Sequence, residues 1–379
     1  MKIVFLIEKV GPYHAYRLEQ LMDYMDVVCV ETRPSSERYA WKESQKDTIA
    51  KKIHPFRGNT VEQLSELLRS LQPQVLFVGG YGFKEMIWAM CWGVQKAIPM
   101  VMLSDSTQID EPRHFAKECI KKMIVANCTA AFVAGTSSKA YMEALGMASN
   151  AIFTPYDIVD NDFYAEKIEL TSLHHRPYLV CVSRLLPQKN LFFLVDVFAA
   201  LAPKYSIDLL ILGNGELEVP LQKYISEKGL NQRIFLKGFL HREVVRQYYH
   251  HAQALILAST SEPWGLCVNE AMAAGLPVLV STHCGAAIDL VEEGRNGYTF
   301  SPMQRETAVE VLNSFLQLDE IAQKKMGEQG RQIIDNYSGK VYRQAVVDIV
   351  SYIKTKPKKS QYFSGLKKWF LLFISRKIN

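Results

Sequence analysis

The sequence predicts an α/β protein with two doubly wound parallel sheets. Short apolar runs rich in β-branched residues, each ended by a polar residue or a glycine, are typical of buried parallel strands. Segments with an apolar residue every three or four positions lie between these runs and are typical of amphipathic helices. The alternation stops near residues 171–177, where polar residues and a proline interrupt it, and then begins again. Two successive β–α series of this kind indicate two domains of the same class.

The first series of elements occupies the amino-terminal half of the chain, with expected helices at 15–24 and 61–71. The expected strands are 1–7, 26–31, 74–80, 99–105, 130–135 and 151–157. We predict that this first domain covers residues 1–172, with the linker to the second domain around 171–177.

The second series begins directly after this linker and has the same rhythm. Its expected strands are 178–183, 207–213, 233–238, 254–259 and 277–281. Its expected helices are 191–201, 218–228, 243–250 and 265–274, and residues 303–353 are mostly helical by period. We predict a second domain over 173–340 and a separate carboxy-terminal segment over 341–379.

Composition agrees with a globular chain of two domains. The chain has 379 residues, of which 48% are hydrophobic and 22% are charged, and about 100–200 residues make one domain. The seven cysteines form no CxxC pair, so they predict reduced, buried thiols and no disulfide or zinc framework. Residues 1–10 are interrupted by Glu8 and Lys9, which does not suit a secretory signal, and no run of about 18 apolar residues occurs. We therefore expect a cytoplasmic protein.

The positive charge is concentrated at the carboxyl end. The net charge is +5, and residues 354–379 contain eight lysines and arginines and no acid, which leaves −3 for the rest of the chain. Within residues 364–377 the lysines flank a contiguous apolar run, a pattern that suits an interfacial helix on an anionic membrane surface. A terminal helix packed on the first domain explains it equally well. No nucleic-acid-binding motif accompanies the basic residues, so we expect no nucleic-acid partner.

Two carboxylates separated by seven residues, Glu262 and Glu270, lie in the stretch SEPWGLCVNEAMAAG at 261–275. The predicted strand at 254–259 places Glu262 in the loop at its carboxyl end, where open parallel sheets bind ligands. Glu270 falls within the following helix among small and apolar residues, where a carboxylate is costly unless something satisfies it. Glu270 is also compatible with a structural acid that caps neighbouring backbone, or with an acid on a solvated face.

Two cations, Arg184 and Lys189, follow the first strand of the second domain. A guanidinium fork and an ammonium group at a strand end suit a leaving diphosphate, whose developing charge needs fixed positive groups. Backbone amides at Gly265 and Leu266, where the next helix begins, add donors and the helix dipole. Taken singly, Arg184 and Lys189 are equally compatible with surface cations.

The first domain offers weaker candidates at its own strand ends. Gly11 follows the first strand and permits a close backbone approach, and Pro12 suits the first turn of a helix. His14 is a candidate contact for sugar or acceptor, or else a packed histidine. Asp105 is the charged residue at its strand end. A basic segment could meet an anionic acceptor, although a solvated helix face is the usual explanation: Arg113, His114, Lys117, Lys121 and Lys122.

Two patterns are interpreted as local structure. Asp160-Asn161-Asp162 is a D-x-D sequence, the pattern that holds a divalent metal in another fold, but we take it as turn chemistry between the domains. GNGELE at 213–218 contains Gly-x-Gly, but Glu218 occupies the third glycine position of a dinucleotide fingerprint. We therefore expect neither a metal site nor a dinucleotide cofactor.

The second domain resembles the retaining, nucleotide-sugar-dependent glycosyltransferases of family 4, which have the GT-B fold of two Rossmann-like domains facing across a cleft. Glu262 and Glu270 match the family's E-x7-E element. The further matching segments, in the family's order, are VSRLLPQKN (182–190), LLILGNGELE (209–218), IFLKGF (234–239) and CGAAIDLVEEGRNGYTF (284–300). The first domain matches more loosely, and Gly11 stands where the family often has a glycine-rich turn.

The resemblance implies a role for each matched residue. Arg184 and Lys189 would bind the donor diphosphate, Glu270 the ribose hydroxyls and Glu262 the hydroxyls of the donor sugar. The base would be read by backbone groups near Gly238 and Phe239, and the last helix, from about Val341, would return to the first domain.

The resemblance also implies the reaction: transfer of a sugar from a nucleoside diphosphate sugar to an acceptor hydroxyl with retention of configuration, with no required metal and no other cofactor. A glycan or lipid-linked acceptor in polysaccharide or glycolipid assembly is expected. Two alternatives share the architecture: a nucleotide-sugar epimerase or phosphorylase, and a non-catalytic nucleotide-sugar-binding module.

Overall fold

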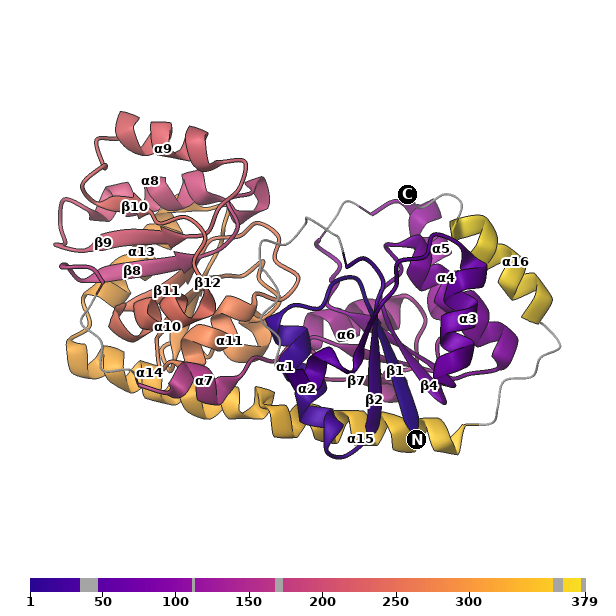
Figure 1. The fold of residues 1–379 in the computed structure, drawn as a ribbon. Coiled ribbons are helices and arrows are strands. Elements are labelled where there is room, and N and C mark those ends of the chain that lie inside the picture. The colour runs from indigo at the N-terminus through magenta and orange to yellow at the C-terminus, as the bar shows by residue number, and fades with distance from the viewer. Residues whose placement is uncertain (35–46, 111–112, 168–172, 357–363, 376–379) are drawn as a thin grey trace. The chain divides into compact units, whose positions relative to one another are not determined.

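The protein consists of two compact α/β units in a computed structural model. The structure describes residues 1–34, 47–110, 113–167, 173–356 and 364–375. The first unit contains Met1–Ile158 and the carboxy-terminal segment Gly339–Asn379, and the second contains Val159–Ser338 (Figure 1).

The first unit has a seven-stranded sheet in the order β3-β2-β1-β4-β5-β6-β7, and its neighbouring strands pair in parallel. The strands are β1 (Lys2–Ile7), β2 (Asp26–Glu31), β3 (Ile53–Pro55), β4 (Val75–Gly79), β5 (Met100–Ser104), β6 (Ala130–Val133) and β7 (Ile152–Phe153). The helices before the crossover are α1 (Pro12–Met22), α2 (Asp47–Ala50), α3 (Val61–Leu71), α4 (Lys84–Lys96), α5 (Phe115–Val125) and α6 (Thr136–Ala144). Strands and helices alternate along the chain, and the strands run parallel. The carboxyl ends of all the strands therefore lie at the same edge of the sheet.

Local sequence explains where these helices begin. Thr60 caps α3, because its side chain accepts the N–H of Gln63 while Gln63 reaches back to the backbone of Thr60. Pro12 occupies the first turn of α1, where its missing N–H costs nothing. The strands other than β3 are largely buried, as parallel strands covered on both faces must be.

The second unit has a six-stranded parallel sheet in the order β10-β9-β8-β11-β12-β13. The strands are β8 (Tyr178–Val182), β9 (Asp208–Leu212), β10 (Ile234–Leu236), β11 (Ala254–Leu257), β12 (Val278–Ser281) and β13 (Gly297–Phe300). The helices are α7 (Asn161–Ala165), α8 (Leu191–Leu201), α9 (Glu218–Glu227), α10 (Arg242–His251), α11 (Leu266–Ala273), α12 (Ala287–Leu290), α13 (Arg305–Leu316) and α14 (Glu320–Ile334).

The predicted α/β class with two parallel sheets is confirmed, and each predicted strand is present. The sequence reading missed two edge strands, β3 and β13. β3 is three residues long and contains a histidine and a proline, and β13 reads Gly-Tyr-Thr-Phe. An edge strand has a partner on one side only, so it needs neither the length nor the apolar continuity by which a central strand is recognised.

The units divide at different residues from those expected. The first boundary lies at Ile158/Val159 and the second at Ser338/Gly339, whereas the sequence placed them after 172 and 340. The short helix α7 accounts for the first difference, because it packs on α11 of the second unit. Asp160 caps α7 by accepting the N–H of Phe163, at 3.2 Å, so the D-x-D sequence begins a helix.

The carboxy-terminal segment of the chain packs within the first unit. Helix α15 (Gly339–Thr355) lies against α1, and α16 (Ser364–Ser375) lies against α4 (Figure 1). Leu371 and Ile374 of α16 are buried in the core around α4, while Phe373 is 48% exposed. The side chains of residues 364–369 lie outside the described part of the chain. Within the described ranges, no helix has both the length and the apolar character to cross a membrane.

Replacing Leu371 with alanine tests how firmly α16 is docked. Loss of a fully buried leucine side chain leaves a cavity, and we expect the free energy of unfolding to fall by about 3 kcal/mol in a chemical denaturation experiment. Phe373→Ala on the same helix is the control and should cost less than half as much, because that ring is half exposed. Equal losses in the two variants would contradict the docking of α16 through Leu371.

Candidate functional site

The carboxyl edge of the second sheet brings together the segments that carry most of the predicted site residues. The loops that follow β8, β9, β11 and β12 all leave the sheet at this edge, because the strands are parallel. The loop after β8 contains Arg184 and Lys189, and the loop after β11 contains Glu262. The turns after β9 and β12 contain Gly213 to Gly215 and Cys284 to Gly285. Gly238 and Phe239 follow β10 at the same edge. The sequence-based placement of these residues at one edge therefore agrees with the structure.

Lys189 and Glu262 form an ion pair between the loops after β8 and β11. The Lys189 ammonium donates to Glu262 Oε2, and the side chains are 10% and 14% exposed. The loop of Glu262 is itself fixed by backbone bonds, since Glu262 N–H donates to His283 O (3.2 Å) and Gly285 N–H donates to Glu262 O (2.8 Å). The sequence placed these two residues in one site but did not predict their contact.

The Gly-x-Gly turn after β9 holds the loop that carries Arg184. A Cβ on Gly213 would lie 1.9 Å from Ser183 O, and one on Gly215 would lie 2.4 Å from Leu185 O. Both glycines have positive φ angles, 140° and 157°. The contact is closed by a 2.8 Å hydrogen bond from Leu185 N–H to Asn214 O. The glycines are therefore needed for direct backbone packing. The Arg184 side chain is exposed.

A third glycine fixes the loop of Glu262. A Cβ on Gly285 would lie 1.9 Å from Pro263 O, so the turn after β12 and the Glu262 loop are in backbone contact. Gly265 has a φ of 101° and ends that loop at the N-cap of α11, whose first residue is Leu266. Trp264 ties the Glu262 loop to α11, because its indole N–H donates to Asn269 Oδ1 at 2.9 Å.

Gly238 and Phe239, the expected base-reading positions, adjoin the Gly-x-Gly turn. Gly213 N–H donates to Gly238 O at 2.8 Å, and Gly238 has a φ of 68°. The Phe239 side chain is 40% exposed. An exposed ring beside backbone polar groups suits a flat heteroaromatic ligand, although the role of Gly238 and Phe239 stays a prediction.

Glu270 lies inside the second unit and is satisfied by two tyrosines. The side chain is 3% exposed. Its Oε1 accepts the hydroxyl of Tyr164 on α7 at 2.6 Å, and its Oε2 accepts the hydroxyl of Tyr249 on α10 at 2.8 Å. Burial, followed by the charge of Glu270, holds the pKa of Tyr249 well above its usual value, so this hydroxyl remains a donor. Sequence reasoning missed both tyrosines, because their distance along the chain from Glu270 gives no local signal.

In the first unit, Gly11 and His14 lie at the beginning of α1. Gly11 is the N-cap residue, and its N–H donates to His14 Nδ1 at 3.3 Å. Burial, followed by the nearby Arg17 guanidinium, lowers the pKa of His14. This imidazole is therefore neutral at pH 7. Because its Nδ1 accepts the Gly11 N–H, its proton lies on Nε2, which can donate one hydrogen bond.

A buried ion pair that the sequence analysis missed lies next to these residues. Arg17 Nη2 donates to Asp157 Oδ1 at 2.6 Å, with side chains 5% and 7% exposed, and the guanidinium lies 4.3 Å from the centroid of the Tyr156 ring. Asp105, by contrast, has an exposed side chain after β5, and its carbonyl accepts the hydroxyl of Ser138. Arg17 and Asp157 lie 140 residues apart, so no spacing pattern pairs them.

The basic segment around α5 is partly used within the protein. Arg113 donates to Tyr141 Oη (2.8 Å) and to Gln108 O (2.9 Å), and Lys121 donates to Glu118 (2.9 Å). Lys117 and Lys122 are exposed. The exposed cations available to an anionic partner on this helix are thus fewer than the sequence suggests.

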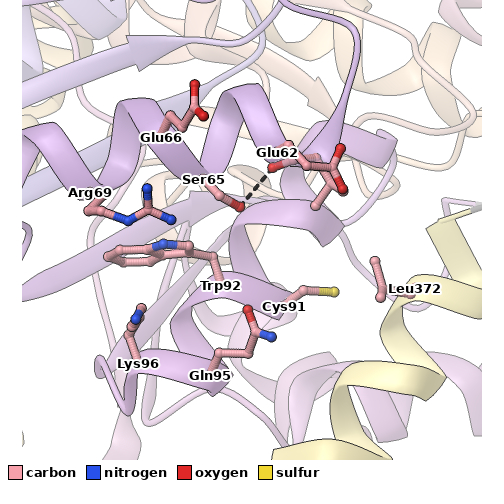
Figure 2. Close-up of a pocket in the computed structure, with 10 residues that line it drawn as sticks. Glu62, Ser65, Glu66, Arg69, Cys91, Trp92, Gln95, Lys96 and Leu372 are labelled. Atoms are coloured by element: carbon pink, nitrogen blue, oxygen red, sulfur yellow. Dashed lines mark hydrogen bonds between the residues drawn. The ribbon is translucent and has the colours of Figure 1, made fainter.

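A groove of about 630 Å³ lies outside both strand-end sites, between α3, α4 and Leu372 of α16. Figure 2 shows Arg69 and Lys96 on opposite sides of the Trp92 ring, with Glu62 and Glu66 farther along α3. Two cations and two acids line this groove, so its charge favours neither an anion nor a cation. The groove was not predicted from the sequence.

The segment that contains the strand-end site of the second unit matches a known protein family. The family model of glycosyl transferases group 1 matches residues 164–333. These residues form a group 1 glycosyl transferase domain. The match covers almost all of the second unit and begins at Tyr164, within α7. It confirms the expected glycosyl transferase group 1 type, while the assignment to the retaining enzymes of family 4 stays a prediction.

Curated relatives align with the chain over part of their length. The poly(glycerol-phosphate) alpha-glucosyltransferase of Bacillus subtilis is 29% identical over 51% of this chain and 28% of its own length. The alpha-monoglucosyldiacylglycerol synthase of Acholeplasma laidlawii is 32% identical over 32% of this chain and 31% of its own length. The chain therefore spans about a third of the length of these relatives.

Solved structures resemble nearly the whole chain. Anabaena HepE, in its complex with UDP and glucose, superimposes with a TM-score of 0.76 over 93% of this chain and 99% of HepE, at 17% identity. The fold class is therefore confirmed as GT-B, with two Rossmann-like domains, while the predicted cleft between them stays a prediction.

The Lys189–Glu262 pair gives a testable expectation for stability. Lys189→Met or Glu262→Gln leaves the other charge without its partner in a largely buried position, and we expect each change to lower the free energy of unfolding by about 2 kcal/mol. The double variant removes both charges and should recover at least half of that loss. Chemical denaturation of the four proteins measures this, and strictly additive losses would contradict the coupling.

Proposed function

We propose that the chain is a retaining glycosyltransferase that moves a sugar from a nucleoside diphosphate sugar to an acceptor hydroxyl. The observation that carries the proposal is the group of Arg184, Lys189 and Glu262 at one strand edge, inside the segment that matches the glycosyl transferase model. Epimerase, phosphorylase and non-catalytic binding have no comparable support.

The chemistry follows from which charges are available. The exposed Arg184 guanidinium can bind two oxygens of a leaving diphosphate, and its loop is held by the Gly213 turn, so little reorganisation is needed when charge develops. Lys189, which follows the same strand, adds a point charge. In the free protein this ammonium is neutralised by Glu262, so a donor diphosphate would compete with or share that contact.

Glu262 and Glu270 are assigned to the donor and not to bond making. Glu262 is partly exposed and is proposed to accept hydroxyls of the donor sugar, while Glu270 is proposed to accept the ribose hydroxyls. With no carboxylate assigned as nucleophile, retention is best explained by attack on the face from which the diphosphate leaves. The leaving phosphate oxygen would then take the acceptor proton, and no metal is required by this scheme.

The first unit is proposed to bind the acceptor. Gly11, the neutral His14 and the exposed Asp105 lie at its strand ends, and they offer hydrogen-bonding groups suited to hydroxyls. HepE is described as a complex with UDP and glucose, which makes UDP-sugars the first donors to test. The relatives that glucosylate poly(glycerol phosphate) or diacylglycerol favour a glycan or lipid-linked acceptor in polysaccharide or glycolipid assembly.

A panel of UDP-, GDP- and ADP-sugars tests the proposal directly, with hydrolysis or transfer as the readout. Arg184→Ala should lower kcat for the accepted donor by about 100-fold, because one preorganised charge on the leaving group is lost. Arg295→Ala is the matched control, since Arg295 is a half-exposed arginine of the same unit that pairs with Glu292. A wild-type protein that acts on none of the donors, or equal activity of the two variants, would refute this assignment.

We also propose that the protein works in the cytoplasm as a peripheral protein on an anionic membrane surface, attracted by the cations of residues 354–379. Leu371 and Ile374 are buried against α4, so these two apolar side chains of α16 are used within the first unit. The attraction is therefore proposed to be mainly electrostatic.

Replacing the eight lysines and arginines of 354–379 with glutamine tests this attraction. Binding to vesicles containing anionic lipid at low salt should fall by at least tenfold, since each cation near such a surface contributes about 1 kcal/mol. Binding to neutral vesicles should not change. Unaltered binding to anionic vesicles would remove the membrane proposal and leave the enzymatic one intact.

A further inference from the structure

The groove between α3 and α4 offers different hydrogen-bonding groups at its two ends. Trp92 lies at one end, with Arg69 and Lys96 on opposite sides of its ring. Glu62 and Glu66 lie farther along α3 (Figure 2). An indole, a guanidinium and an ammonium carry donors only, whereas ionised carboxylates carry acceptors only. The groove therefore has a donor end and an acceptor end.

The Trp92 indole is a buried donor that has no partner among the described residues. Trp92 is 6% exposed, and its Nε1 is shielded from solvent and makes no hydrogen bond. A buried N–H without an acceptor costs about 1–3 kcal/mol, and the two neighbouring cations cannot relieve that cost, because they have no acceptor. The Arg69 side chain beside the ring is exposed, so its rotation gives a ligand access to the indole. An acceptor that enters this end of the groove therefore satisfies a group that the protein leaves unsatisfied.

The four charged side chains of the groove have their charges available to a ligand. Each is exposed, and none makes an ion pair or a side-chain hydrogen bond with the part of the chain that the structure describes: Glu62, Glu66, Arg69 and Lys96. Arg69 and Lys96 lie in the last turns of α3 and α4, where a cation stabilises the helix dipole. That contribution leaves their N–H donors free to bind an anion.

The dimensions of the groove suit a small ligand that carries both charges. Its volume of about 630 Å³ is within the range of about 300–1,000 Å³ that is usual for ligand sites. Glu66 precedes Arg69 by three residues, so the two ends are about 4.5 Å apart along the axis of α3. Leu372 of α16 adds an apolar wall. A ligand that meets all of these groups has an anionic group and an amine joined by a short aliphatic spacer.

We propose that this groove binds a zwitterionic phosphate ester with a primary amine, the chemistry of a phosphoethanolamine group. The phosphate accepts the Trp92 indole N–H and is bound by Arg69 and Lys96, because a guanidinium fork matches two phosphate oxygens. The ammonium group donates to Glu66 and Glu62. The site lies outside both strand-end sites and does not depend on the proposed glycosyl transfer. Phosphoethanolamine occurs in soluble phosphodiesters and in lipid headgroups, and the experiment separates these two sources.

Calorimetry of the full-length protein with three soluble probes tests the two ends separately. Glycerophosphoethanolamine carries both charges, glycerophosphoglycerol is the same phosphodiester without the amine, and ethanolamine is the amine alone. We expect the wild-type protein to bind the zwitterion at least tenfold more tightly than either other probe. Arg69→Gln should weaken binding of both phosphodiesters about tenfold and leave ethanolamine within about twofold. Glu66→Gln should weaken the zwitterion and ethanolamine about tenfold and leave glycerophosphoglycerol within about twofold.

A third variant tests the unsatisfied indole, and two others serve as controls. Trp92→Phe keeps an aromatic ring but removes the N–H, so it should weaken both phosphodiesters about fivefold and leave ethanolamine unchanged. Glu143→Gln, at an exposed acid of α6, and Arg295→Gln, in the second unit, should change no affinity. Thermal unfolding shows whether each variant keeps its fold, and the two surface variants decide the test if Trp92→Phe does not fold.

Vesicles separate a lipid headgroup from a soluble ligand. Sedimentation is compared for phosphatidylcholine vesicles with and without phosphatidylethanolamine, both of which carry no net charge and therefore attract the basic residues 354–379 weakly. The quaternary ammonium of phosphatidylcholine has no N–H for the acids of the groove. Sedimentation that requires phosphatidylethanolamine and is lost in Glu66→Gln would support the site with a lipid as its source. Binding of the soluble zwitterion alone would support the site with a soluble phosphodiester as its source.

Two results would overturn the inference. The first is a wild-type protein that binds the phosphoethanolamine group neither in solution nor in vesicles. The second is equal weakening of all three probes by Arg69→Gln and Glu66→Gln, because the two ends of the groove would then not recognise separate charges. Neither result bears on transfer from a nucleotide sugar, which the donor panel tests.

Discussion

The candidate site depends on direct backbone contact between the loops at the carboxyl edge of the second sheet. The turn after β9 touches the loop after β8, and the turn after β12 touches the loop after β11, at distances that no side chain would permit. Gly213, Gly215 and Gly285 make these contacts possible. Arg184 and Glu262 lie outside regular elements, but their loops are held in place by these backbone contacts. Fixed backbone of this kind is a condition for electrostatic preorganisation of a site.

The charges at this edge are arranged so that the buried ones are paired and an exposed one faces solvent. Lys189 and Glu262 neutralise each other, and the Glu270 carboxylate receives two hydroxyl donors. Arg184 remains exposed. An unpaired buried charge costs several kcal/mol, whereas an exposed one costs little. The free protein can therefore be stable and still present a cation where a diphosphate would bind.

The sequence predicted what depends on local pattern and missed what depends on distant contacts. The central strands were recognised because burial on both faces makes them continuously apolar, while β3 and β13 lack that signal. The roles of Glu262 and Lys189 stay predictions, and both residues were selected as site candidates through motif spacing. Tyr164, Tyr249, Arg17 and Asp157 were not, because each belongs to a pair whose members come together only in the folded chain.

The misplacement of α7 shows the same limit and has a functional consequence. Polar residues and a proline at 171–177 marked a linker, which is a sound inference from composition. Composition does not show that a short helix before the linker packs on α11, nor that its single tyrosine reaches Glu270. The glycosyl transferase match also begins at 164, the position of that tyrosine. The packing of α7 on α11 places this helix in the second unit, and Tyr164 of α7 supplies one of the two hydroxyl donors to the Glu270 carboxylate.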